Sequence, residues 1–258
     1  ILTIRTTNYK FSMPKTNTKE SGFEDFIENE LLARHGYRSR QSSSLDKKLA
    51  LDSGLVVEFV QKSQPEAWER LVEQYGEDVS ERFLARLDSE IGERGLLDVL
   101  RKGVRDRGVT VRLAFWQPQN DLNPELVADY EQNILSVIRQ VKYSEQNENS
   151  IDMVLFLNGL PVFTLELKNQ LTGQTVRHAM AQYRGDRDPK EKLLSPGRCL
   201  THFAVDTEEV FMTTELKGLK TYFLPFNKGN NGGAGNPPVE DAYMTCYLWE
   251  EVFAKDSF

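Results

Sequence analysis

Hydrophobic and polar residues change their spacing about midway along the chain. Up to residue 107, apolar side chains recur three or four positions apart, as at Phe23, Ile27 and Leu31. This spacing is that of amphipathic helices, and the heavily charged positions between the apolar ones are typical of a solvated outer face. The pattern predicts helices over residues 18–36, 58–62, 66–75, 79–92 and 96–107.

The second half of the chain has the shorter period of β-strands. Val109 to Phe115 alternates apolar with polar residues, and further short apolar runs follow, separated by loops rich in Pro, Asn and Gly. One helix, over residues 175–184, interrupts them, and another begins at residue 125. The expected strands cover residues 109–115, 137–143, 151–157, 161–167, 200–205, 210–214 and 220–225. We therefore expect an α/β fold with a mixed central sheet of five or six strands, flanked by helices and preceded by a helix-rich half.

Charged residues interrupt the two most apolar of these strands. Met153–Leu157 and Pro161–Leu167 are otherwise almost wholly apolar, as in strands covered on both faces. Asp152 opens the first strand, and Glu166 and Lys168 close the second. Burying an unpaired carboxylate or ammonium is costly, so such charges are expected to pair with one another or to hold a metal.

The alternation of side chains along a strand constrains how these charges meet. Glu166 and Lys168 share one face of their strand, and Asp152 joins them only if it lies opposite Glu166. A plain two-residue turn at 158–159 would instead pair Asp152 with Leu165 and place the carboxylates on opposite faces. We therefore predict either a three-residue loop, Asn158 to Leu160, or a bulge in its place.

Two carboxylates and a lysine at one point suit metal-assisted hydrolysis of a phosphodiester. Neighbouring carboxylates repel each other and both ionise readily only around a cation, and oxygen ligands of this kind suit Mg²⁺. Asp152 and Glu166 would hold the metal. Lys168 would position or help to deprotonate the attacking water, or neutralise charge on the phosphate. The alternative is a buried structural ion pair between Glu166 and Lys168.

Several stretches resemble a known family. Asp152, followed after thirteen residues by Glu166-Leu-Lys168, is similar to the PD-(D/E)xK nuclease motif, with Ile151 in place of the proline. The longer similarity runs from Thr18 to the end and resembles the N-terminal region of Type I restriction endonuclease R subunits. It rests on residues 111–115, 143–150, 166–169, 182–189, 202–206 and 212–214.

This resemblance implies a fold, a reaction and partners. It implies the PD-(D/E)xK fold and Mg²⁺-dependent cleavage of duplex DNA by Asp152, Glu166 and Lys168. In the full-length protein it implies a helicase-like, ATP-driven translocase, with ATP not bound by the present chain. Further partners would be the methylation and specificity subunits of a restriction–modification complex in the cytoplasm.

Two supporting residues follow from the same resemblance. The family carries a Gln-x-x-x-Tyr motif after the catalytic strand that helps to place DNA. Gln182 matches the glutamine, whereas Asp186 stands at the tyrosine position and Tyr183 directly follows the glutamine. Related nucleases use a glutamate on the first helix, and Glu20 is the candidate because it precedes Phe23 by three positions. Structurally, Gln182 could be an exposed helix residue and Glu20 a complement to the helix dipole.

Composition limits the possible partners and compartments. The net charge of −7 argues against a free-standing, tight nucleic-acid binder. The segment 168–198 is an exception, with seven Lys or Arg against three Asp or Glu, and its loop 184–196 could follow a phosphate backbone. Two cysteines without metal-ligand spacing indicate a reducing compartment, and no apolar run reaches membrane-spanning length.

The expected organisation is one large domain followed by a tail. We expect a nuclease domain over residues 13–228, with a helix-rich part at 18–107 and the catalytic sheet at 109–228. Residues 229–258 would be a flexible linker and an aromatic docking segment leading to the absent motor, and residues 1–12 look like additions upstream of the natural start. Two other functions stay open, a non-catalytic scaffold and a stand-alone repair nuclease of the same fold.

Overall fold

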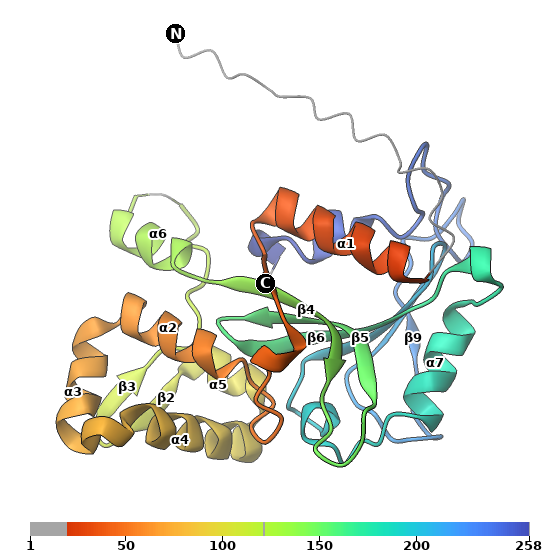
Figure 1. The fold of residues 1–258 in the computed structure, drawn as a ribbon. Coiled ribbons are helices and arrows are strands. Elements are labelled where there is room, and N and C mark those ends of the chain that lie inside the picture. Colours follow the sequence, from red (N-terminus) through yellow and green to blue (C-terminus); the bar gives the residue numbers. More distant parts are fainter. Residues whose placement is uncertain (1–19, 121, 258) are drawn as a thin grey trace, which may run out of the picture.

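A seven-stranded mixed sheet forms the centre of the molecule (Figure 1). The computed structural model describes residues 20–120 and 122–257, and of Glu20 it describes only the backbone. The strand order is β1-β4-β5-β6-β7-β8-β9. The β1–β4 and β6–β7 pairs are parallel and the others antiparallel, which confirms the predicted mixed sheet. The strands are β1 Arg38–Arg40, β4 Leu135–Lys142, β5 Ser150–Leu157, β6 Leu160–Leu167, β7 Thr201–Val205, β8 Val210–Thr213 and β9 Leu224–Pro225.

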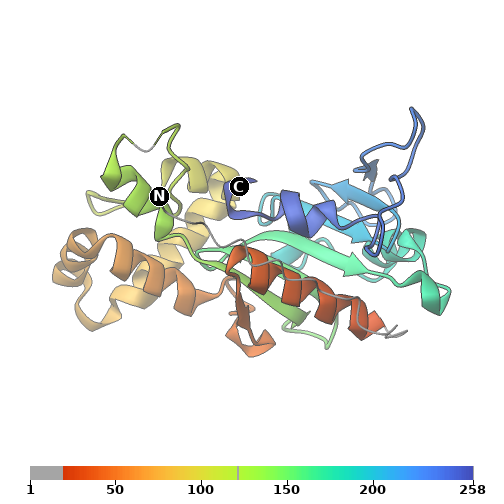
Figure 2. The same ribbon diagram turned by 90° about the horizontal axis from the view of Figure 1, so that it is seen from above.

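Helices cover both faces of this sheet. Helix α1 (Glu20–His35) lies across one face beside the C-terminal segment, as both views show (Figures 1 and 2). Helix α7 (Val176–Gly185) packs on the other face, where Ala179 and Tyr183 join Val154 of β5 in a second buried cluster. The helix predicted over residues 175–184 is therefore confirmed, and β5 and β6 are covered on both sides.

The helix-rich part forms a lobe at one end of the sheet (Figure 1). Its helices are α2 Ser53–Ser63, α3 Pro65–Tyr75, α4 Val79–Arg94 and α5 Leu96–Lys102, and α6 Pro124–Glu131 follows the lobe in sequence. Helix α5 ends earlier than predicted because Gly103, at φ 71°, approaches the Val111 carbonyl so closely that a Cβ would lie 2.4 Å from its oxygen. Residues 104–106 then form a strand instead of helix.

The strand predicted over residues 109–115 does not belong to the central sheet. It is shortened to β3 (Val109–Val111) and pairs only with β2 (Val104–Asp106), in a separate two-stranded sheet that packs on α3 and α4. The alternating pattern was correctly interpreted as a strand. Its assignment to the catalytic sheet was wrong, because the pattern of a strand does not identify its partner.

The β5–β6 hairpin has a two-residue turn and a bulge. Leu157 pairs with Leu160 across Asn158 and Gly159, both at positive φ, as a tight hairpin turn requires. Leu155 then faces Phe163 while Phe156 faces Pro161, so one extra residue bulges out of β6. This shift pairs Met153 with Leu165 and brings Asp152 opposite Glu166. The bulge that we predicted as an alternative to a longer loop is confirmed.

The C-terminal stretch is ordered against the domain. The segment expected to be a flexible linker closes on itself, because the Gly229 N–H donates to the Gly235 carbonyl and Asn236 Oδ1 accepts from the Lys228 N–H. Beyond it, Trp249 and Phe253 are fully buried, and Trp249 stacks edge-on against Phe23 of α1. The aromatic residues that we expected to dock on a neighbouring domain thus complete the core of this one.

Within the described part of the chain, no helix combines the length and the hydropathy that a bilayer crossing requires. Both cysteines are buried and free.

Candidate active site

Glu166 is the most deeply buried of the three predicted catalytic residues. Its side chain, near the end of β6, is completely inaccessible. The Nε–H of Arg187 donates to Glu166 Oε1 over 2.6 Å, whereas Oε2 is buried without a hydrogen-bond partner. Burial and then the nearby Asp152 charge raise the pKa of Glu166 well above its ordinary value, against the opposing effects of Arg187 and Lys168. This carboxyl group is poorly satisfied by the protein alone.

Asp152 lies beside Glu166 because of the bulged register. The backbone N–H of Leu167 donates to Asp152 Oδ2 over 2.8 Å, which fixes the carboxylate against the end of β6. Gln140 Nε2 lies 3.4 Å from Asp152 Oδ1, on the other flanking strand. The two acidic side chains therefore lie next to each other on adjacent strands, as the sequence predicted.

Lys168 completes the predicted triad of charges. Its backbone N–H donates to the Val205 carbonyl at the end of β7, and its side chain is mostly buried. The ammonium lowers the pKa of Glu166, which places its charge within electrostatic reach of that carboxyl group. Glu166 also forms a buried ion pair with Arg187, a cation that the predicted Glu166–Lys168 alternative did not include.

A third acidic residue, Glu24 of α1, reaches the same place. Gln140 Nε2 donates to Glu24 Oε1 over 2.8 Å, so Gln140 bridges Glu24 and Asp152. Burial, with a further contribution from Asp152, raises the pKa of Glu24 to about 7. Gln140 has a positive φ of 47°, which is uncommon for a residue other than glycine and indicates backbone strain at this point.

The first-helix glutamate was therefore only partly identified from the sequence. The Glu20 side chain lies outside the described residues, so its predicted role stays a prediction. Glu24 precedes Ile27 by three positions, so the criterion that selected Glu20 also selects Glu24. The Glu24 carboxylate contacts Gln140 and Arg139 of β4.

Gln182 lies on α7, on the same side of the sheet as Glu166. Its side chain is half-buried rather than exposed, and its Oε1 is buried without a hydrogen-bond partner. Tyr183 is fully buried, and its hydroxyl is 2.8 Å from the Thr164 hydroxyl. The tyrosine beside Gln182 therefore anchors α7 to β6, two residues before Glu166.

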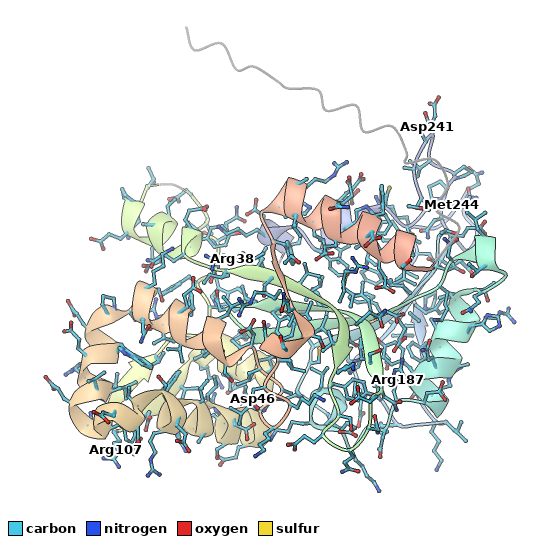
Figure 3. All side chains as sticks on the ribbon, viewed as in Figure 1. Arg38, Asp46, Arg107, Arg187, Asp241 and Met244 are labelled. Atoms are coloured by element: carbon cyan, nitrogen blue, oxygen red, sulfur yellow. The ribbon has the colours of Figure 1, made fainter. Side chains whose placement is uncertain are left out.

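The basic loop after α7 is less available to DNA than its composition suggests. Arg187 is buried on Glu166, and Arg198 and Lys192 both lie within ion-pair distance of Asp88 in α4. Figure 3 shows Arg187 beside α7. These cations hold the loop on the domain.

The chemistry of the donor set fits a magnesium ion. Among residues 20–120 and 122–257, no three His, Cys, Asp or Glu side chains form a group that could hold a metal ion by themselves. Mg²⁺ commonly uses one or two carboxylates and completes its shell with water and substrate phosphate oxygens. Asp152 and the unpartnered Oε2 of Glu166 match that smaller requirement.

A mixed sheet flanked by helices, with an aspartate, a glutamate and a lysine at the ends of two central strands, defines a nuclease-like α/β domain. The sequence matches the family described as Type I restriction enzyme R protein N terminus over residues 18–221. The chain belongs to this family. No curated protein matches the sequence.

Proposed function

We propose that this domain cleaves duplex DNA by metal-dependent hydrolysis of a phosphodiester bond. The observation that carries the proposal is the buried, unpartnered oxygen of Glu166 beside Asp152. Two adjacent buried carboxylates cost stability unless a cation joins them, so their presence is explained by a site that binds one. Membership of a restriction-enzyme family supports the same reaction class.

Each residue has a distinct part in this proposal. Asp152 and Glu166 would hold Mg²⁺, which activates water and stabilises negative charge when it is bound. Lys168 orients the attacking water or offsets the charge that grows on the phosphate. Glu24 lies beside these residues, and burial together with the Asp152 charge raises its pKa to about 7 in the metal-free domain. Gln182 contacts the DNA from α7.

The complete enzyme would couple this reaction to movement along DNA. Family membership places the domain in an R protein, where we propose that a helicase-like motor translocates DNA with ATP. The methylation and specificity subunits would supply recognition of the DNA sequence. The domain itself would bind duplex DNA and Mg²⁺ but no ATP, in the cytoplasm.

The proposal is tested in the full-length R subunit assembled with its partners. We expect Lys168→Ala to abolish DNA scission while ATP turnover continues, because the lysine acts only on the phosphodiester. Lys62→Ala, an exposed lysine in the last turn of α2 in the helical lobe, is the matched control and should preserve both activities. Scission at the wild-type rate by Lys168→Ala would refute the proposal.

The buried Arg187–Glu166 ion pair favours one other candidate, a non-catalytic scaffold. Breaking a buried pair costs about 3–5 kcal/mol, so a structural role predicts that Glu166→Ala strongly lowers the melting temperature. In that case the folded fraction of Glu166→Ala would still support restriction. The nuclease proposal predicts that the folded fraction of this variant does not cleave.

A further inference from the structure

Arg187 is buried, although burying an arginine at this position adds little to the stability of the domain. The Arg187 residue is only 6% exposed, and its partner Glu166 is 0% exposed. Removing two charges from water is expensive, and a buried ion pair often stabilises a fold no better than apolar residues of similar volume. Stability alone therefore does not explain why an arginine occupies this position.

The backbone around Arg187 is fixed at several points. Before it, the Asp186 N–H donates to the Gln182 carbonyl and closes α7. After it, the Ser144 hydroxyl donates to Glu191 over 2.6 Å, and Leu193 and Leu194 are fully buried. The loop thus presents the guanidinium from a supported backbone, and the hydrogen bond to Glu166 sets the orientation of the carboxylate.

The contact with Arg187 leaves the two carboxylate oxygens of Glu166 in different environments. Oε1 accepts the Nε–H of Arg187, and Oε2 stays buried with no partner. The positive charge of Arg187 also opposes the repulsion that Asp152 exerts on Glu166. A second cation can then bind Oε2 without displacing the arginine.

We propose that Arg187 is a positioning residue, which holds one oxygen of Glu166 so that the other is presented to the divalent ion. This inference rests on the proposed function, because it assumes that Asp152 and Glu166 bind the ion. Groups that hydrogen-bond to metal ligands orient them, and their removal typically lowers metal affinity by about 10–100-fold. Loss of Arg187 should have an effect of that size.

The opposite role for Arg187 gives the opposite result. If the guanidinium simply fills the place of the cation, the ion must displace it, and removing the arginine will tighten binding. If the pair is only structural, its loss will lower the melting temperature without changing the affinity of the folded protein. Metal affinity therefore separates the three roles.

The test is a calorimetric titration of the 258-residue chain with Mn²⁺. Arg187→Gln retains a hydrogen-bond donor without the charge, and Arg187→Lys retains the charge without the planar fork. We expect Arg187→Gln to weaken Mn²⁺ binding at least about 10-fold and Arg187→Lys to recover part of the loss. Arg184→Gln is the matched control, since Arg184 lies three residues earlier, in the last turn of α7, and donates to the Thr221 carbonyl rather than to Glu166.

Each outcome decides the inference. Unchanged or tighter Mn²⁺ binding by Arg187→Gln would overturn it while leaving the proposed function intact. If Arg187→Gln does not fold, unchanged or tighter binding by Arg187→Lys would overturn it equally. Absence of Mn²⁺ binding to the wild-type chain would contradict the proposed function itself, and with it the role of Arg187.

Discussion

The two ends of the β5–β6 hairpin differ in how well their buried polar groups are satisfied. At the turn, Asn158 is fully buried, and its side chain accepts from the Ile134 N–H and donates to the Leu113 carbonyl. The carbonyl of Gly159 accepts from the Asp52 N–H at the start of α2. This end ties the sheet to the helical lobe, and both polar atoms of the Asn158 side chain are hydrogen-bonded.

At the open end of the hairpin, two carboxylates lie together, and one oxygen of Glu166 has no partner. Gln140 beside them has a strained backbone. Such features cost stability and concentrate at functional sites, where the rest of the fold holds them in place. The turn, with Asn158 and Gly159, is thus the structural end of the hairpin, and the open end, with Asp152 and Glu166, is its chemical end. Mutations at the structural end should lower stability, and mutations at the chemical end should lower DNA cleavage.

The largest difference between the effect on DNA scission and the effect on stability is expected for Asp152→Asn, at the chemical end. Asparagine can still accept from the Leu167 N–H but lacks the charge to hold a divalent ion. We expect scission by the full-length R subunit to fall more than about 100-fold, since even indirect ligand contacts are worth about 10–100-fold. The change should cost less stability than Gly159→Ala at the turn, because the repulsion between residues 152 and 166 is removed.

Asp129→Asn, on the remote helix α6, is the control for this change and should cleave normally. Cleavage by Asp152→Asn at the wild-type rate would contradict the assignment of the catalytic residues to the open end of the hairpin.

Gly159→Ala, at the turn, is expected to lower stability rather than to remove a catalytic group. The added Cβ would lie 2.5 Å from the Asp52 carbonyl oxygen, and the residue has a φ of 81°. Overpacking together with the left-handed backbone should lower the free energy of unfolding by about 2–4 kcal/mol. Urea unfolding measures this loss.

Gly173→Ala is a matched control, since Gly173 has a similar φ of 78° but no atom within 4 Å of its added Cβ. It should cost less than half as much. Equal costs for the two glycines would show that contact with α2 does not matter.

A smaller effect concerns pH. The pKa of Glu24 rises from 4.5 to about 7 in the folded chain, so between these values the native state binds a proton that the unfolded state releases. This contribution to stability is present below pH 4.5 and is lost as pH rises through about 7. Its slope is at most about 1.4 kcal/mol per pH unit.

Unfolding of the metal-free chain between pH 5 and pH 7.5 measures this slope, with the pH range chosen to span the Glu24 transition. Glu24→Gln should flatten it, whereas Asp25→Asn, at the next and exposed position of α1, should not. An identical slope in wild type and Glu24→Gln would contradict the raised pKa of Glu24 and its place beside Asp152.

The hairpin could be predicted from the sequence because the pattern of apolar and charged residues that defines it lies within one short segment. Alternation placed Glu166 and Lys168 on one face, and the requirement that Asp152 share it predicted either a longer loop or the bulge that is found. Gln140 and Arg187 were missed, because they come from β4 and from the loop after α7, and nothing in their own neighbourhoods marks them. Their roles depend on which elements become neighbours.

The same limit explains the other differences. The Gly- and Asn-rich stretch from residue 227 has the composition of a linker, but Asn236 makes it a closed loop by donating to the Glu208 carbonyl. Trp249 looked like a docking residue because its partner, Phe23, lies at the other end of the chain. Composition describes a segment, whereas burial depends on the rest of the fold.

The most direct test of the central claim is diffraction from crystals of this chain soaked in Mn²⁺. The account predicts an anomalous peak bound to both Asp152 and the free oxygen of Glu166, with Arg187 still hydrogen-bonded to the other oxygen. A chain that binds no Mn²⁺ there, with the Asp152 and Glu166 carboxylates turned away from each other, would contradict it.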